Sequence, residues 1–260
     1  MGFFRRMLGG EEKPAVAAAP SPEAEILEGR RRDVYARLGE LHPDVISRVV
    51  PGPVPWPDSV LGKLLAVRRA QDMLLLTSGL SNFYDAALHP KVPPVPLDYE
   101  LVLTISNRDK AAANAAALAT SWFPSLLLPL GDFVTHQWVD LCGMLKKFGM
   151  VTLPGPAITP EADALADDNG MVGYLVGLPL VGTDVDQQLY VRGFYRDLGR
   201  GLEEATMGIF SVKPLTRDEY AWAQAQGNDG GVRLAEAFIR RGDVGAHWTG
   251  RPSVLEQPTL

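Results

Sequence analysis

Short apolar runs of strand length constrain the fold of this chain more than any other feature. The clearest runs are residues 61–67, 73–77 and 99–105, and the third alternates side-chain types with a period of two. Proline clusters at 51–57 and 90–96 flank these runs and predict extended connections, because proline fixes φ and removes a backbone donor. The first half of the chain is therefore predicted to build a sheet.

Helical segments lie between and around these runs. A helix is predicted from Pro22, because apolar residues then follow a 3.6-residue period until Pro43 ends the pattern. Residues 110–122 are rich in alanine and predict a second helix that stops before Pro124.

In the second half, Thr159 can cap a short helix, and Thr216 with Glu219 forms a capping box in front of another. A last helix is predicted over 232–241, ending at Gly242.

Further strands are predicted at 171–178, 188–195 and 207–212. Strands and helices interleave without the regular alternation of a doubly wound sheet. We therefore expect an α+β fold, a single mixed-sheet domain flanked by helices.

Composition excludes several classes of protein. The chain has 260 residues, with 25 basic and 31 acidic side chains and a formal net charge of −6, which argues against a dedicated nucleic-acid binder. Cys142 is the one cysteine, so neither a disulfide framework nor a cysteine-based zinc site can form. The longest apolar run, residues 122–130, is too short to span a membrane.

The domain boundaries follow from the same patterns. Residues 1–22 are rich in Ala, Pro, Gly and Glu and predict a mobile N-terminal tail without room for a signal peptide. The folded domain is expected at 23–245, followed by a C-terminal tail at 246–260. A cytoplasmic location is expected.

The usual catalytic signatures are absent from the sequence. It contains no G-x-G-x-x-G, Walker or H-E-x-x-H motif and no G-x-S-x-G elbow. Four histidines (His42, His89, His136 and His247) are far apart and are expected on the surface or in caps. Cys142 has apolar neighbours that indicate a core position. We predict no catalytic residue, no metal site and no cofactor.

One stretch of the chain is distinctly acidic. No basic residue occurs between Lys147 and Arg192, whereas six acids do. These are Glu161, Asp163, Asp167, Asp168, Asp184 and Asp186. A solvated face, a docking surface for a basic partner and a divalent-cation site are all compatible with this pattern.

Four short strings occur in a distinctive order: 78–84 (SGLSNFY), 99–105 (YELVLTI), 130–134 (LGDFV) and 212–220 (VKPLTRDEY). Their order and spacing resemble the suppressor-of-fused domain family over residues 45–240. The second domain of the animal protein has no counterpart, so the chain resembles the bacterial stand-alone type.

The resemblance implies a mixed α/β domain that binds proteins and has no catalytic activity. The animal protein is a cytoplasmic inhibitor that holds a transcription factor by an extended peptide, and the bacterial domains are proposed immunity proteins that neutralise toxins. The expected partner is thus a protein, with a basic toxin domain or regulatory protein as the candidate. Binding could use β-augmentation of an exposed strand, or the acidic face.

The residues in the four strings divide into two groups. Residues expected to be structural are Gly79, Leu80, Phe83, Gly131, Asp132, Pro214, Leu215, Thr216 and Glu219. Candidates for direct partner contact are Tyr84, Glu100, Asp167, Asp168, Asp184 and Asp186. Gly79 is expected in a turn after a strand, Asp132 in a turn after Gly131, and Tyr84 as a half-buried ring with a free hydroxyl.

Two alternatives stay open from the sequence. Carboxylates of the 161–186 stretch could serve a metal-dependent hydrolase, and the proline clusters could serve an assembly subunit as extended ligands.

Overall fold

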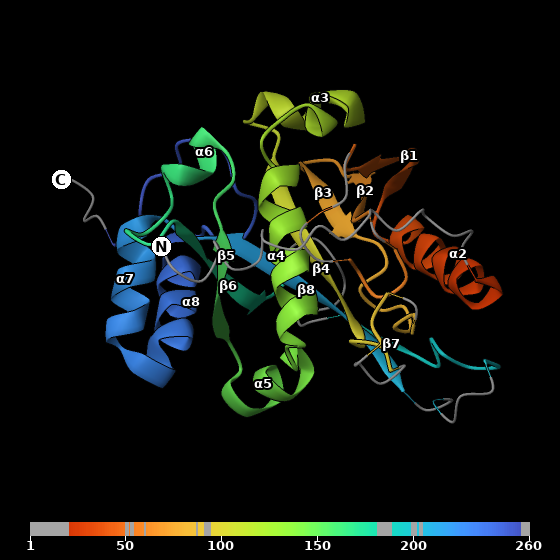
Figure 1. Cartoon of the computed structure of the whole chain (residues 1–260). Helices are drawn as coiled ribbons and strands as arrows, with labels where there is room; N and C mark the ends of the chain where they lie inside the picture. Colours follow the sequence, from red (N-terminus) through yellow and green to blue (C-terminus); the bar gives the residue numbers. More distant parts are fainter. Residues whose placement is uncertain are drawn as a thin grey trace, which may run out of the picture.

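A mixed eight-stranded sheet forms the middle layer of the molecule (Figure 1). The computed structural model describes residues 21–49, 52, 55–59, 61–86, 88–90, 95–180, 189–198, 202 and 205–255. The strands are β1 (Glu40–Ser47), β2 (Lys63–Arg68), β3 (Asp72–Thr77), β4 (Tyr99–Ser106), β5 (Val151–Pro156), β6 (Met171–Leu178), β7 (Leu189–Arg192) and β8 (Thr206–Pro214).

The spatial order of the strands is β1-β2-β3-β4-β8-β6-β5, and β7 pairs with β8. All neighbours are antiparallel except β4 and β8, which run parallel. The predicted α+β class with a mixed sheet is therefore confirmed.

Side-chain parity divides the core between the two faces of the sheet. In β2, Leu64 and Ala66 point to one cluster, and Leu65 and Val67 point to the other. Strands buried on both faces read as continuous apolar runs, which is why the 61–67 and 73–77 segments lack polar alternation.

Helices cover both faces. One face carries the 3₁₀ helix η1 (Lys110–Ala113), α3 (Ala115–Ala119), α4 (Pro124–Gln137), α5 (Leu141–Phe148) and α6 (Pro160–Asp163). The other carries α2 (Pro22–Ala36) over β2–β4, and α7 (Arg217–Ala225) with α8 (Gly230–Arg241) over β6; the 3₁₀ helix η2 (Gly227–Asp229) links the last two.

Several predicted element ends are confirmed. Helix α2 begins at Pro22 with Ser21 as its cap, Thr216 and Glu219 form the capping box of α7, and α8 ends at Gly242 in the left-handed conformation. Residues 167–170 make the predicted turn before β6.

The first helix is shorter than predicted. It ends at Ala36, and residues up to Ser47 form β1, in which Pro43 lies at a register shift between Leu41 and Val45. An edge strand tolerates proline because one side of its backbone has no strand to bond. The 110–122 helix is also divided, because Asn114 is extended and caps α3 anew.

The prediction of a turn at Gly131-Asp132 is wrong, because both residues lie in the middle of α4. Pro124 opens this helix at its first turn, where the missing N–H costs nothing. A Cβ at Gly131 would lie 2.4 Å from Cζ2 of Trp56, so the glycine lets the indole pack on the helix. Asp132 then accepts the indole N–H at 3.0 Å.

Residues 246–255, which we assigned to a C-terminal tail, pack against the domain. His247 bridges to Ile105 of β4, and Arg251 and Val254 are buried. The packed part of the chain thus extends beyond residue 245. Residues 1–20 of the N-terminal tail and residues 256–260 lie outside the described residues.

Replacing Gly131 by alanine tests the helix–indole contact. Helix propensity alone would make Gly131→Ala stabilising by up to about 1 kcal/mol. We expect it instead to lower the free energy of unfolding by about 1–3 kcal/mol, because the new Cβ overlaps Trp56.

Urea unfolding measures the effect, and Gly29→Ala is the matched control. Gly29 lies in α2 with nothing near its Cβ direction, so this control should be neutral or stabilising. Equal stabilisation by both variants would contradict the packing argument.

Candidate functional site

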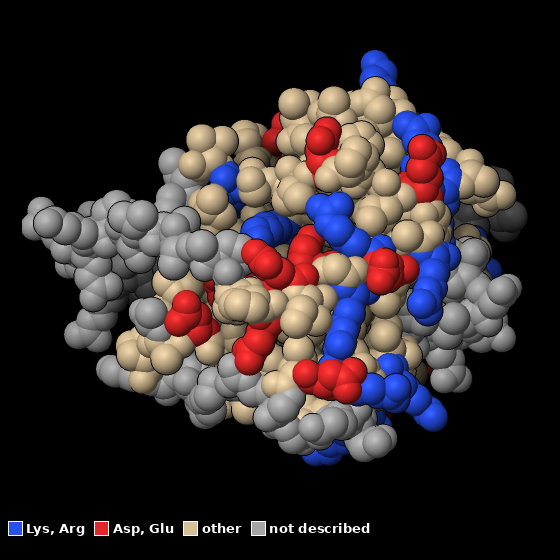
Figure 2. Space-filling model, turned by 90° about the vertical axis from the view of Figure 1, so that its right-hand side faces the viewer, with Lys and Arg blue, Asp and Glu red and all other residues tan. Residues whose placement is uncertain are grey.

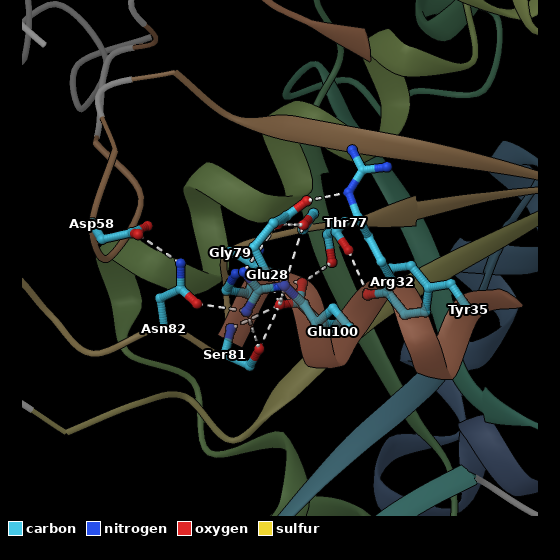
Figure 3. Close-up of polar contacts among 12 residues, drawn as sticks. Glu28, Arg32, Tyr35, Asp58, Thr77, Gly79, Ser81, Asn82 and Glu100 are labelled. Carbon is cyan, nitrogen blue, oxygen red and sulfur yellow. Dashed lines mark hydrogen bonds and ion pairs between the residues drawn. The ribbon is translucent and has the colours of Figure 1, made fainter. Parts of the chain in front are cut away.

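The 78–84 string forms a tight loop around the carboxylate of Glu100 (Figure 3). Glu100 Oε1 accepts from the backbone N–H groups of Gly79 and Ser81, both at 3.0 Å, and Oε2 accepts from the Thr77 hydroxyl at 2.6 Å. The Ser81 hydroxyl donates to Oε1 at 2.7 Å. Because the side chain is fully buried, these donors replace the water that an ionised carboxylate needs.

Arg31 of α2 supplies the positive charge of this cluster. Its Nε lies 3.8 Å from Glu100 Oε1 and donates to the Ser78 hydroxyl at 3.2 Å. Its Nη1 donates to Ser81, and its Nη2 donates to Glu28 at 3.1 Å. Burial alone would lower the pKa of Arg31, but the two carboxylates outweigh it and raise the pKa.

The loop conformation accounts for three signature residues. Gly79 has φ +126°, which a side chain would strain, and this confirms the turn predicted there. Leu80 and Phe83 are buried. The prediction of a half-buried Tyr84 with a free hydroxyl is wrong: the residue is 3% exposed, and its hydroxyl donates to Thr135 O at 3.3 Å.

Glu100 and Tyr84 are therefore buried in the interior of the domain, and neither side chain lies on the described surface, where a partner would bind. The sequence alone did not reveal Arg31, because an arginine on an amphipathic helix normally faces solvent.

Glu100→Gln tests the cluster, since the amide would direct an N–H group at atoms that are themselves donors. We expect the free energy of unfolding to fall by about 3 kcal/mol or more, because the Arg31 charge loses its buried counter-charge.

The exposed Glu40→Gln on β1 is the matched control and should change stability by less than about 0.5 kcal/mol. Chemical denaturation of both variants decides the point, and equal small effects would show that Glu100 is dispensable.

The 212–220 string anchors the C-terminal segment in the same way. Glu219 Oε1 accepts from Arg251 Nη1 at 2.9 Å and from the backbone N–H of Val254 at 2.8 Å. Lys213 Nζ lies 3.3 Å from Asp243 Oδ1. Burial lowers the pKa of Lys213 to about 8, although Asp243 opposes this. Pro214 is the last residue of β8, Leu215 and Thr216 connect this strand to α7, and Leu215 is buried.

His247 is buried beside these cations. Its ring packs edge-on to Trp122 and Phe123, and its Nδ1 has no hydrogen-bond partner among the described residues. Burial, reinforced by the charges of Arg251 and Lys213, lowers its pKa well below 6.5.

Acid should therefore destabilise the fold through His247. Below pH 6.5 the unfolded chain takes up a proton that the folded His247 refuses, so stability falls with pH. We expect a loss of up to about 1.4 kcal/mol per pH unit from this group. Urea unfolding from pH 7 to pH 5 measures it, and His247→Phe should flatten the slope. An unchanged slope in that variant would contradict the assignment.

The described acids at positions 167 and 168 make separate local contacts. Asp167 Oδ1 accepts from the backbone N–H groups of Asn169 and Met171, and Asp168 Oδ1 lies 3.2 Å from Arg217 Nη1. Asp184 and Asp186 lie outside the described residues. On the face formed by α2 and β1, acidic and basic side chains are intermixed (Figure 2).

The described residues contain no group of three or more His, Cys, Asp or Glu side chains able to hold a metal ion. His89 donates through Nε2–H to Trp56 O at 3.0 Å and is buried like His247. Both lie in the interior rather than at the expected surface positions. Within the described parts of the chain, no helix is long and apolar enough to cross a membrane.

A different surface combines exposed aromatic rings with a strained acid. Trp138 is 45% exposed where α4 ends, and Tyr190 of β7 is 40% exposed. Asp98 directly precedes β4: its carbonyl accepts from Gly208 N at 2.8 Å and lies 3.9 Å from Cys142 Sγ. Gly208 is the register partner of Tyr190. We call Asp98, Trp138, Asp140 and Tyr190 the Asp98 surface.

Asp98 carries several local costs. Its φ of +61° is rare for a residue with a side chain, and its buried Oδ1 lacks a hydrogen-bond partner among the described residues. Burial raises its pKa to about 6, despite a hydrogen bond from Tyr195, and the charge of Asp140 adds to the rise. Burial also raises the pKa of Cys142 to about 11, so this thiol is not activated as a nucleophile.

A solved structure shares this fold. No protein-family model and no curated protein sequence matches the chain. The structure titled "Crystal structure of Drosophila Suppressor of Fused" matches 90% of this chain and 52% of its own, with 15% identity and a TM-score of 0.50. The structure titled "the Sufu-Fu complex crystal structure" matches 91% of this chain and 93% of its own, with 14% identity and a TM-score of 0.48.

The chain has a Suppressor of Fused-like fold. It spans about half the length of the Drosophila chain. The fold-family resemblance of the four strings is thus confirmed at the level of the fold, and the strings lie at its buried anchors.

Proposed function

We propose that this Suppressor of Fused-like domain is a non-catalytic protein-binding domain that inhibits its partner by occlusion. The observation that carries the proposal is the exposure of two large aromatic side chains, Trp138 at the end of α4 and Tyr190 of β7. Tryptophan and tyrosine dominate the binding energy of protein interfaces, because each buries a large rigid surface and keeps a polar group.

The rings are held in place by buried neighbours. Trp138 lies 6.4 Å, ring to ring, from Tyr84, and Tyr190 lies 5.8 Å from Phe210. The Tyr99 hydroxyl donates to Val139 O at 2.9 Å and fastens the α4–α5 connection. A surface ordered in this way loses little side-chain entropy on binding.

The backbone of the edge strand β5 is poorly suited to pair with a strand of a partner, which favours docking on the Asp98 surface instead. Ala157 N donates across to Gly170 O, so by parity the backbone N positions of residues 152, 154 and 156 face outward. Two of these are Pro154 and Pro156, which leave only one outward N–H donor on this edge for an added strand.

A cytoplasmic immunity protein that covers a toxin domain is the form of inhibition we propose. The resemblance to bacterial stand-alone domains and the lack of catalytic motifs in the sequence support this form. The acidic residues Asp167, Asp168, Asp184 and Asp186 stay candidates for steering a basic partner.

Affinity capture tests the proposal with three versions of the full chain. Wild type and Ile239→Ala, a control that removes an exposed apolar side chain on α8, should retain the same stoichiometric protein from lysate of the producing cells. Trp138→Ala should lose it, because removal of a hot-spot ring weakens binding by about 2 kcal/mol or more. Quantitative mass spectrometry is the readout.

Tyr190→Ala serves as a second variant in case Trp138→Ala alters the end of α4. A partner that all four versions retain equally would contradict docking at the Asp98 surface, and a chain that captures no protein would contradict the proposed function.

A further inference from the structure

We propose that residues 246–250 form an acid-released strap: protonation of His247 frees this segment from the end of β4, while residues 251–254 stay anchored to α7. The proposal does not depend on the proposed function. It assigns a local opening to the protonation of His247, in addition to a loss of global stability.

The strap fills a gap in the sheet beside β4. The pairing of β4 with β8 covers residues 99–102, and from Ser211 onward β8 pairs with β6. Near the end of β4, His247 lies parallel to Ile105 in place of a strand: its N–H donates to Thr104 O at 2.8 Å, and its carbonyl accepts from Ser106 N at 2.9 Å. One isolated bridge with two hydrogen bonds can open while the neighbouring strands stay paired.

The ring of His247 lies where a charge has no compensation. It is 2% exposed and edge-on to Trp122 and Phe123, with ring centroids 5.9 and 6.1 Å apart, and its Nδ1 has no hydrogen-bond partner among the described residues. An imidazolium has two N–H donors. Protonation in place would therefore bury both a charge and an unsatisfied donor among aromatic rings, which is costly.

The charged groups near the strap already balance one another. The cations are Lys213 of β8 and Arg251, and the anions are Asp243 and Glu219. Lys213 Nζ lies 3.3 Å from Asp243 Oδ1 and donates to Gly245 O, next to the strap, at 3.2 Å. Arg251 Nη1 donates to Glu219 at 2.9 Å. Both cations oppose the protonation of His247, so a third positive charge would have no counter-charge in this cluster.

The segment after the strap is held more firmly. Arg251 is buried and donates to Glu219 through both Nη1 and Nη2, and the Val254 N–H donates to the same carboxylate at 2.8 Å. Gly250, which has φ +74°, lies at the boundary between strap and anchor, and Gly245 precedes the strap. Glycine permits the backbone rotation that a local release requires.

The tip of the strap does not itself respond to mild acid. Asp109 accepts from the Thr249 N–H at 2.9 Å and from its hydroxyl at 2.7 Å. Burial opposes the effect, but hydrogen bonds from Thr249 and Ala111 keep the pKa of Asp109 below its usual value. Arg108, which lies over the Trp248 ring, stays charged throughout this range. His247 is therefore the group of the strap that titrates between pH 7 and pH 5.

Amide hydrogen exchange of the full chain at pH 7 and pH 5 tests the proposal. A released His247 has the ordinary pKa of 6.5 and the closed one a much lower pKa, so the opening equilibrium should rise about 20-fold. The protection factors of Ser106, His247 and Thr249 should fall by this amount and lie at least about tenfold below that of Val254 at pH 5. Equal protection of all four amides would mean that the strap leaves only on global unfolding, and would overturn the proposal.

His247→Phe removes the titrating group and keeps an aromatic ring against Trp122 and Phe123. Its strap amides should be protected equally at pH 7 and pH 5, whereas the control His136→Gln, which removes an exposed histidine on α4, should respond like the wild type. A 20-fold response that persists in His247→Phe would contradict the assignment.

Lys213→Met is the second variant, in case His247→Phe does not fold. It removes one cation of the cluster, so an imidazolium is better tolerated in the closed strap. The ratio of opening at pH 5 to opening at pH 7 should therefore shrink several-fold. An unchanged ratio in this variant would overturn the proposal.

Discussion

The buried contact between Arg31 and Glu100 is the interaction on which the rest of the structure depends. It connects α2, the loop after β3 and the start of β4, three segments that are far apart in the sequence. Burying two charges is costly, and the cost is met here because Glu100 and Arg31 are surrounded by matching donors and acceptors. A wrong packing of α2 would leave both charges without partners, so the pair favours one arrangement of the helix over others.

The same physical device recurs at two other places. Asp132 of α4 accepts from Arg48 and Trp56 and thereby fixes the segment after β1, and Glu219 of α7 binds Arg251 and fixes the C-terminal segment. In each case an acid from a recognisable string meets a base from a distant segment. The strings therefore identify the fold, and surface residues outside them are free to determine what the domain binds.

Asp98 and Glu100 show how two carboxylates in one strand region can have opposite roles. Tyr195 links them, because its hydroxyl donates to Ser81 O at 3.0 Å while its interaction with Asp98 opposes the rise in the pKa of that acid. Glu100 is saturated with donors and stabilises the fold. Asp98 has a positive φ and a buried Oδ1 without a hydrogen-bond partner among the described residues, so it does not stabilise the fold in the same way.

The sequence by itself determined the features that depend on neighbouring residues. Apolar runs of strand length, alternating or continuous, determine the strands β2, β3, β4, β6 and β8. Local capping residues determine the ends of α2, α7 and α8. Tertiary structure decided whatever depends on a distant contact. Pro43 is a strand residue because it lies at a sheet edge, and Gly131 is a helix residue because Trp56 needs the space. Arg31 is buried because Glu100 lies opposite, and the Asp98 carbonyl is positioned by the backbone N–H of Gly208. No pattern within a short window of sequence contains these pairings, since each joins residues dozens of positions apart.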